Sequence, residues 1–373
     1  MNESIYLDNN ATAPTRMEVI RAVEGVMASV GNPSSVHRHG RNARKILEQA
    51  RRDVARLCNV SPEMVTFTSG GTEANNIVLQ GAGRQRVLMS AVEHPSVREA
   101  CPDAEIIPVD HAGVIDLGVL ETMLASDGSP ALVSVMAANN ETGVIQPVSR
   151  IANLAHQHGA LVHCDGVQAV GKYTIDVTEL GVDFLVLSSH KIGGTAGCGA
   201  IINRNDLPLE PLVHGGGQER KVRSGTENLV GIAGLGAAAA AVLQNGEAEA
   251  ARMKQMRDRL EGRITEQIPS AIVVGVDAER LVNTSCLILP GIISETQVMA
   301  LDLAGISVSA GSACSSGKVS VSPVLDAMGY AENESSSAIR VSFGWANDDH
   351  DVERFVDAFI ALYERARDRQ SAA

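Results

Sequence analysis

The chain has 373 residues, of which 45% are hydrophobic and 20% are charged. This composition is typical of a globular protein and excludes disorder as the default state. Lys and Arg number 31 against 44 Asp and Glu, a net charge of −13, which argues against a protein that binds nucleic acid by neutralising phosphates. The first residues lack the basic and apolar regions of a secretory signal, and no apolar run reaches the ~18–20 residues of a membrane span. We therefore expect a cytoplasmic protein without a membrane partner.

The first two thirds of the chain alternate between helical and strand-like patterns. Ser34 or Ser35 is the predicted N-cap of a long helix, whose apolar residues recur every three or four positions up to Leu57. Short apolar runs predict strands buried on both faces at 64–68, 131–137, 161–164 and 184–187, with helices at 73–79 and 151–158. This alternation predicts an α/β fold with a mostly parallel sheet covered by helices on both faces.

The last third of the chain changes character. An Ala-rich stretch predicts a helix over 227–243 that ends near Asn245-Gly246, and a charged segment with helical spacing follows. Further strands and helices are predicted at 271–274, 284–289, 295–303 and 351–367. This mixture indicates a smaller α+β domain, with the domain boundary near residue 248.

Glycines follow the predicted strand at 64–68. The sequence Ser69-Gly70-Gly71-Thr72 opens a helix there, and glycines at a helix N-terminus allow the backbone to approach an anion closely. The segment lacks the lysine of a P-loop and the spacing of a dinucleotide-binding turn. A phosphate cradle and a simple glycine turn are both compatible with it.

Charged residues follow two later strands of the predicted sheet. Asp165 ends one strand, and Lys191 comes directly after another. Taken singly, Asp165 could be a helix N-cap and Lys191 a surface lysine. Together with the glycine turn they are what pyridoxal phosphate needs: a lysine for the Schiff base, a carboxylate for the ring nitrogen and a cradle for the phosphate.

Cysteine positions suggest one reactive thiol. Of the six cysteines, no two have the CxxC spacing of a metal site, so no metal is expected. Cys314 lies in a small, polar, glycine-rich stretch at about 309–322, where a thiol is expected to be exposed. It could also be an incidental loop cysteine. Cys58 and Cys164 lie among apolar residues and are expected to be buried and inert.

As an ordered set, these residues resemble the cysteine desulfurases of the nitrogen-fixation and iron–sulfur-assembly type, which are fold-type I pyridoxal phosphate enzymes. The resemblance runs nearly from end to end. The matching segments are 6–12, 31–35, 68–73, 93–94, 139–143, 165–168, 188–191, 223–226 and 312–314. The family fold implies a large cofactor-binding domain with a seven-stranded sheet at 14–248, and a small domain formed by 1–13 and 249–373 that carries the Cys314 loop.

The resemblance implies a role for each matching residue. Lys191 would bind the cofactor and then move the Cα proton, His94 would stack on the ring, and Cys314 would be the nucleophile. Asn140 and Arg340 would orient the substrate. The remaining cofactor contacts would come from Asp165 at the ring nitrogen, Gln168 at the phenolic oxygen, Gly71, Thr72, Ser188 and His190 at the phosphate, and Thr226 at the phosphate of the other subunit of a homodimer.

The implied reaction converts L-cysteine to L-alanine and leaves the sulfur on Cys314 as a persulfide. A sulfur acceptor, such as an iron–sulfur scaffold protein, would then take it. One departure from the family is the stretch 192–199, which lacks the usual proline and second lysine after the cofactor lysine. Two alternatives stay open: another fold-type I enzyme, such as an aminotransferase or selenocysteine lyase, and a non-catalytic module that keeps the fold.

Overall fold

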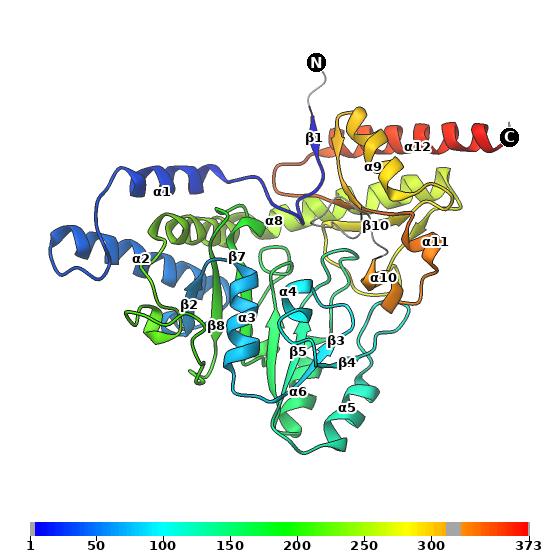
Figure 1. The fold of residues 1–373 in the computed structure, drawn as a ribbon. Coiled ribbons are helices and arrows are strands. Elements are labelled where there is room, and N and C mark those ends of the chain that lie inside the picture. Colours follow the sequence, from blue (N-terminus) through cyan, green and yellow to red (C-terminus); the bar gives the residue numbers. More distant parts are fainter. Residues whose placement is uncertain (1–3, 311–321, 372–373) are drawn as a thin grey trace.

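A seven-stranded sheet forms the centre of the larger part of the protein (Figure 1). The structure is a computed structural model that describes residues 4–310 and 322–371. All neighbouring strands are parallel except β8, which pairs antiparallel with both β2 and β7. In spatial order the strands are β2 (Val65–Thr68), β8 (Gly199–Asn203), β7 (Phe184–Ser188), β6 (Leu161–Asp165), β5 (Ala131–Met136), β3 (Arg86–Ser90) and β4 (Glu105–Ile107). The predicted mostly parallel α/β sheet is confirmed, although β3, β4 and β8 were not predicted.

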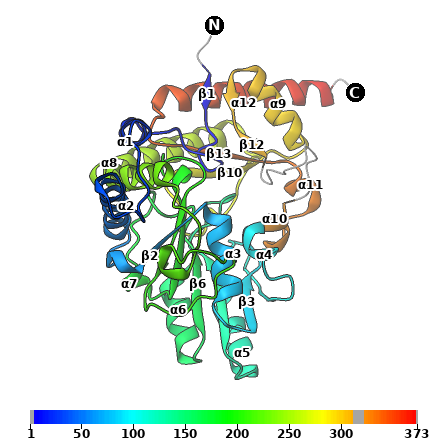
Figure 2. The same ribbon diagram turned by 60° about the vertical axis from the view of Figure 1, so that its left-hand side comes forward.

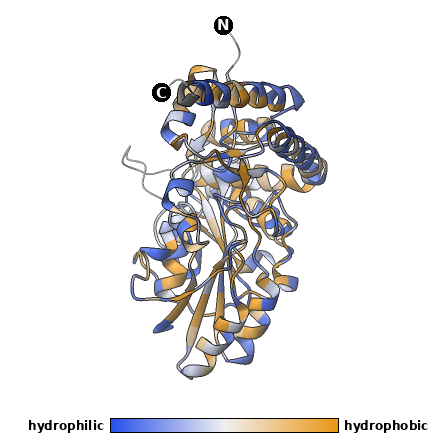
Figure 3. Ribbon diagram, turned by 90° about the vertical axis from the view of Figure 1, so that its right-hand side faces the viewer, coloured by the Kyte–Doolittle hydropathy of each residue, from blue (hydrophilic) through white to orange (hydrophobic). Residues whose placement is uncertain are grey.

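Helices cover both faces of this sheet, because its strands alternate apolar side chains between the two faces. In β7, Leu185 and Leu187 belong to the cluster that holds α2, α6 and α8, whereas Phe184 and Val186 belong to the cluster that holds α3 and α4. The helices of this part are α1 (Met17–Met27), α2 (Arg38–Leu57), α3 (Gly71–Gly81), α4 (Pro95–Arg98), α5 (Leu117–Ser126), α6 (Val148–Gln157), α7 (Val177–Leu180) and the first half of α8 (Leu229–Gln267). Figure 2 shows α1, α2 and α8 together on one side of the sheet, away from α3 and α4. Figure 3 shows hydrophobic residues along the strands between these layers.

A second hydrophobic cluster lies beside the first one, around a four-stranded antiparallel sheet. Its strands, in spatial order, are β12 (Ser309–Ala310), β13 (Ala338–Ser342), β10 (Thr284–Ile288) and β9 (Ile272–Val273). The N-terminal strand β1 (Ile5–Tyr6) joins this part by pairing with β11 (Ile306–Ser307). The helices are α9 (Ser294–Leu303), α10 (Pro323–Ala327), α11 (Glu332–Ser335) and α12 (Asp349–Ser371). The predicted α+β character of this part is confirmed.

Helix α8 is continuous over 39 residues, so the predicted helix end near Asn245-Gly246 is wrong. A glycine inside a helix costs ~1 kcal/mol relative to alanine. Here the two halves of the helix are buried in different clusters, Leu235 in the first and Leu260 in the second, and this burial outweighs the cost. The predicted domain boundary at residue 248 lies inside α8 and stays a prediction.

By length and composition alone, α8 could also cross a membrane. However, 61% of its apolar window is buried inside the protein. It packs against α1, α2 and α12. Among the described residues, α8 is therefore a core helix shared by the two clusters.

The start of α2 also differs from the prediction, because the helix begins at Arg38 and not after Ser34 or Ser35. Asn32 accepts a hydrogen bond from the backbone N–H of Ser34 at 2.8 Å, which closes a turn ahead of the helix. The N-cap is His37, whose Nδ1 accepts from the N–H of Gly40. The spacing of apolar residues located the body of the helix correctly, but two serines in a turn indicated the wrong first residue.

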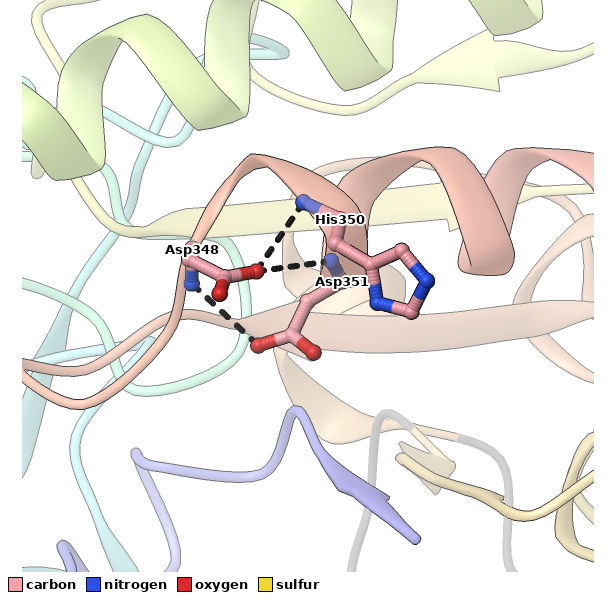
Figure 4. A group of neighbouring side chains, drawn as sticks. All are labelled: Asp348, His350 and Asp351. Atoms are coloured by element: carbon pink, nitrogen blue, oxygen red, sulfur yellow. Dashed lines mark hydrogen bonds between the residues drawn. The ribbon is translucent and has the colours of Figure 1, made fainter. Parts of the chain in front are cut away.

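Acidic residues gather at the first turn of α12 (Figure 4). Asp348 Oδ1 accepts from the backbone N–H groups of His350 and Asp351, at 2.9 and 3.2 Å. Asp351 Oδ2 in turn accepts from the N–H of Asp348 at 3.3 Å. These contacts satisfy N–H groups that a helix leaves without partners at its first turn, so the cluster is explained as a helix cap.

Two glycines of α8 allow a test of the packing between α8 and α2. A Cβ added to Gly236 would lie 2.6 Å from Ala50 Cα, whereas a Cβ on Gly262 would meet nothing within 4 Å. We expect Gly236→Ala to lower the thermal unfolding midpoint, because overpacking of ~1–3 kcal/mol exceeds the ~1 kcal/mol gained in helix propensity. Gly262→Ala should raise the midpoint slightly. Circular dichroism melting curves measure both, and a rise in both midpoints would contradict the close approach.

Candidate active site

A cavity of about 510 Å³ lies at the carboxyl ends of the parallel strands. Asp165 ends β6, Ser188 ends β7, and His94 follows β3 after a short turn. In open α/β sheets the carboxyl ends of the strands are where ligands bind. The predicted site residues that line this cavity are Gly71, Thr72, His94, Asn140, Asp165, Gln168, Ser188, His190, Lys191 and Arg340.

Two predicted residues are not brought to the cavity by the described chain. Thr226 is exposed in the loop before α8 and does not line it. Cys314 lies outside the described residues. The described residues begin again at Ser322, the N-cap of α10, and the next two residues, Pro323 and Val324, line the cavity.

The carboxylate of Asp165 is held by donors at both oxygens. Oδ2 accepts from Asn75 Nδ2 at 2.9 Å, and Oδ1 accepts from the N–H of Val167 at 3.0 Å. The residue is only 6% exposed. Each oxygen therefore has a donor within hydrogen-bonding distance. A buried anion that lines a cavity is suited to pair with a cationic group of a ligand.

Lys191 sits in the turn that follows β7. Its Nζ donates to the backbone oxygen of Ala11 at 3.0 Å and to that of Asn10. Burial lowers the pKa of Lys191 to about 8, and Arg340 acts in the same direction, whereas Asp8 and Asp165 oppose the shift. The neutral amine that a nucleophile or base requires is therefore far more populated near physiological pH than it is for an ordinary lysine.

The N-terminus of α3 faces the same cavity. The first N–H groups of a helix have no partner within the helix and attract anions. A Cβ on Gly71 would lie 2.8 Å from Val167 Cγ2, so glycine is the residue that fits this close approach. Ser188 and His190, from the end of β7 and its turn, complete the wall. Burial lowers the pKa of His190 to about 4, so its ring is neutral there and can donate one N–H.

Arg340, on β13, is already engaged in an ion pair. Its Nη2 lies 2.6 Å from Asp8 Oδ1, and its Nη1 donates to the backbone oxygen of Asn140 at 3.0 Å. Its side chain is 3% exposed, and its Nε is buried without a hydrogen-bond partner among the described residues. A buried donor without a partner is costly, so this arginine retains capacity for a further anionic group.

Two buried carboxyl groups in the cavity wall were not predicted. Glu93 Oε1 accepts from the N–H of Met136 at 2.6 Å, and burial together with Asp165 raises the pKa of Glu93 well above its usual value. Burial raises the pKa of Glu141 to about 7, although the hydroxyl of Ser322 donates to it at 2.6 Å. Both lie inside segments that resemble the family, 93–94 and 139–143, but no role was expected for either.

A buried lysine beneath the cavity was also missed. Lys172 Nζ donates to Gln168 Oε1 at 2.8 Å, and Gln168 Nε2 donates to the backbone oxygen of Asn10 at 3.0 Å. Burial and the charge of Lys191 lower the pKa of Lys172 well below its usual value. Because its oxygen accepts from Lys172, the amide of Gln168 has a fixed orientation. Gln168 and Lys172 lie in turns and not in a helix, so their four-residue spacing gave no signal.

The chain is similar to known proteins over nearly its whole length. The model of the aminotransferase class-V family matches residues 5–355. A cysteine desulfurase from Sinorhizobium fredii is 40% identical over 380 residues, covering 98% of this chain and 97% of that protein. A NifS-like protein from Rickettsia africae superimposes with a TM-score of 0.91 at 35% identity, covering 97% of this chain and 100% of that one.

A further solved structure, of SspA in complex with cysteine, covers 91% of this chain and 99% of its own, with a TM-score of 0.79 at 28% identity. These relatives match nearly the whole chain, so both the sheet and the smaller part lie within the likeness. The chain belongs to the aminotransferase class-V family and, within it, to the cysteine desulfurases.

Proposed function

We propose that this desulfurase releases L-alanine from L-cysteine and carries the removed sulfur on Cys314. The observation that supports the proposal most directly is the single cavity that Asp165, Lys191 and Arg340 line together. An anion, a lysine of lowered pKa and an incompletely satisfied arginine suit a reaction on an amino acid with an electron-accepting cofactor. The cysteine bound in the SspA structure supports the choice of substrate.

Pyridoxal phosphate is the proposed cofactor, and the residues of the cavity fit it. When bound, it supplies a ring that stabilises negative charge at the Cα of an amino acid. Asp165 would hold a proton at the ring nitrogen, and Lys191 would hold the group covalently. Gln168 presents an oriented amide for the phenolic oxygen. The phosphate contacts would come from Gly71, Thr72, Ser188 and His190, with Thr226 contributed to a second subunit.

Substrate binding would use Arg340 and Asn140. The guanidinium of Arg340 would hold the carboxylate of L-cysteine while it keeps its contact with Asp8. Lys191, once free of the cofactor, would take the Cα proton. His94 lies on the same wall, and burial lowers the pKa of its ring, which favours the neutral form that can accept a proton.

Sulfur transfer would use the thiolate of Cys314. The thiolate forms an S–S bond to the substrate sulfur, the C–S bond breaks, and its electron pair stays with carbon, which is protonated to give alanine. Among the described cysteines, burial raises the pKa of Cys58, Cys198 and Cys286 to about 12. Such thiols are poor nucleophiles. This burial supports the assignment of the chemistry to Cys314.

A homodimer and a separate sulfur acceptor are the proposed partners. Large apolar side chains are exposed on α1, on the turns around it and before η3 (Glu219–Lys221): Met27, Val30, Val36, Leu212 and Val213. The loop that carries the exposed Thr226 belongs, like these side chains, to the larger part of the protein that contains the seven-stranded sheet. A second copy of the chain would cover them and receive Thr226. The acceptor would be an iron–sulfur scaffold or another thiol-bearing protein.

Replacement of Cys314 tests the sulfur carrier. With L-cysteine, pyridoxal phosphate and a thiol reductant, the wild-type protein should release alanine and sulfide in equal amounts. Cys314→Ala should lower both by at least about 100-fold, because the displaced sulfur has no nucleophile to accept it. Cys101→Ala is the matched control, since Cys101 is half-buried outside the cavity and should leave both products unchanged. Equal turnover in Cys314→Ala would refute the assignment.

The lowered pKa of Lys191 predicts how cofactor capture depends on pH. Only the neutral amine attacks a carbonyl, so the uptake rate of pyridoxal phosphate by the cofactor-free protein should rise about tenfold per pH unit at low pH. It should level off above pH 8, because the pKa of Lys191 is lowered to about 8. The growth of visible absorbance after mixing measures this rate. Nα-acetyl-lysine is the control, and its rate should climb to about pH 10. A protein profile that follows the free amine would contradict the prediction.

A further inference from the structure

A buried chain of hydrogen bonds extends from the core of the sheet to Asp165. Ser134 on β5 and His163 on β6 are both fully buried, and Asn75 on α3 is 1% exposed. Ser134 Oγ lies 2.9 Å from His163 Nδ1, and His163 Nε2 lies 3.1 Å from Asn75 Oδ1. Asn75 Nδ2 then donates to Asp165 Oδ2 at 2.9 Å. The family resemblance assigned no role to Ser134, His163 or Asn75.

The partners fix the direction of each hydrogen bond in this chain. Asp165 can only accept, so the amide nitrogen of Asn75 must face it and the amide oxygen must face His163. His163 therefore carries its proton on Nε2. Its Nδ1 is then an acceptor, and the hydroxyl of Ser134 donates to it. Burial lowers the pKa of His163 to about 4, which agrees with this neutral ring.

A second branch leaves Asn75 toward His94. Asn75 Nδ2 also donates to Ser96 Oγ at 2.9 Å, and Ser96 Oγ lies 2.8 Å from His94 Nδ1. The backbone N–H of Ser96 donates to the same Nδ1 at 3.0 Å. Since Nδ1 accepts, a neutral His94 ring carries its proton on Nε2. One amide group thus orients both the carboxylate and the imidazole of the cavity.

We propose that Asn75 and His163 are positioning residues, which hold Asp165 and His94 in the orientation and hydrogen-bonding state that the bound cofactor ring requires. His163 acts through Asn75, because its Nε2–H blocks the alternative orientation in which the Asn75 oxygen would face Asp165. The inference rests on the proposed cofactor. It adds residues that touch neither cofactor nor substrate and act through Asp165 and His94.

Other titratable groups face Asp165 and must be considered in any measurement of pH dependence. Glu93 follows β3, Cys164 lies on β6 and Lys191 follows β7, and each interacts electrostatically with Asp165. The raised pKa values of Glu93 and Cys164 favour their neutral forms. Variants whose pH midpoints are compared should therefore keep Glu93, Cys164 and Lys191 unchanged.

The test uses the protein loaded with pyridoxal phosphate and two readouts: the dissociation constant of the cofactor, and the pH midpoint of its visible absorption band. In Asn75→Ala we expect cofactor binding to weaken by about tenfold or more, as loss of a hydrogen bond to a charged group implies. The pH midpoint of the visible band should also move to higher pH. A ring nitrogen that holds its proton less firmly carries less positive charge, so the proton whose loss changes the band would be held more tightly.

Variants of His163 separate positioning from structural support. His163→Gln keeps an N–H donor toward Asn75 and should have a midpoint close to that of the wild type. His163→Leu removes the donor and should shift the midpoint as Asn75→Ala does, and the double variant should shift it no further. Asn76→Ala is the control, because Asn76 also links α3 to Ser96, but its other hydrogen bonds go to the backbone oxygen of Thr72 and to the side chain of Gln80, and none goes to Asp165. Its midpoint should not move.

The outcomes distinguish this inference from the proposed function. A wild-type protein that develops no visible band would overturn the cofactor and this inference with it. A normal wild-type band, with unshifted midpoints in Asn75→Ala and His163→Leu, would overturn this inference alone, even if the thermal unfolding midpoints fall. A shift in His163→Leu that His163→Gln restores would support it.

Discussion

The buried negative charge of Asp165 is the constraint on which the rest of the site depends. A carboxylate at the end of a central strand is stable only if donors satisfy its oxygens, and Asn75 and the N–H of Val167 do so. Its charge then determines which way Asn75 turns and which nitrogen of His163 carries the proton. Glu93, close by, is kept neutral partly by the same charge. One carboxylate therefore determines the orientation or the protonation state of several neighbouring side chains.

A residue near the N-terminus connects this charge to the smaller part of the protein. Asn10 donates to Thr284 on β10, and its side-chain oxygen accepts from Lys172 and Asn283. Its backbone oxygen accepts from Lys191. The side of the cavity that contains Arg340 is thereby held against the side that contains the lysine. A shift of either part would break hydrogen bonds of buried groups, which is costly.

Residues next to strand ends could be predicted from the sequence, because a buried strand and the residue after it are both visible as local patterns. This is how Asp165 and Lys191 were found, and both line the cavity. Asn75 and Lys172 could not be found in this way, since their partners depend on which strand or turn lies opposite them in the fold. Local patterns also failed at Gly246. The low helix propensity of glycine predicted that the helix ends there, but the residues before and after it are buried in two hydrophobic clusters, and α8 continues.

The order in which the chain is synthesised gives α8 a particular consequence. Its second half contributes Met256 and Leu260 to a cluster that also needs Phe355 and Phe359 of α12. The N-terminal strand β1 likewise cannot pair until β11, about 300 residues later in the chain, has been synthesised. The larger sheet can form while the chain is still leaving the ribosome, whereas β1 and the second half of α8 find their partners only after β11 and α12 have been synthesised. Until then, half of α8 and the first strand present apolar surface to the cell, which is the interval when a chaperone would be of most use.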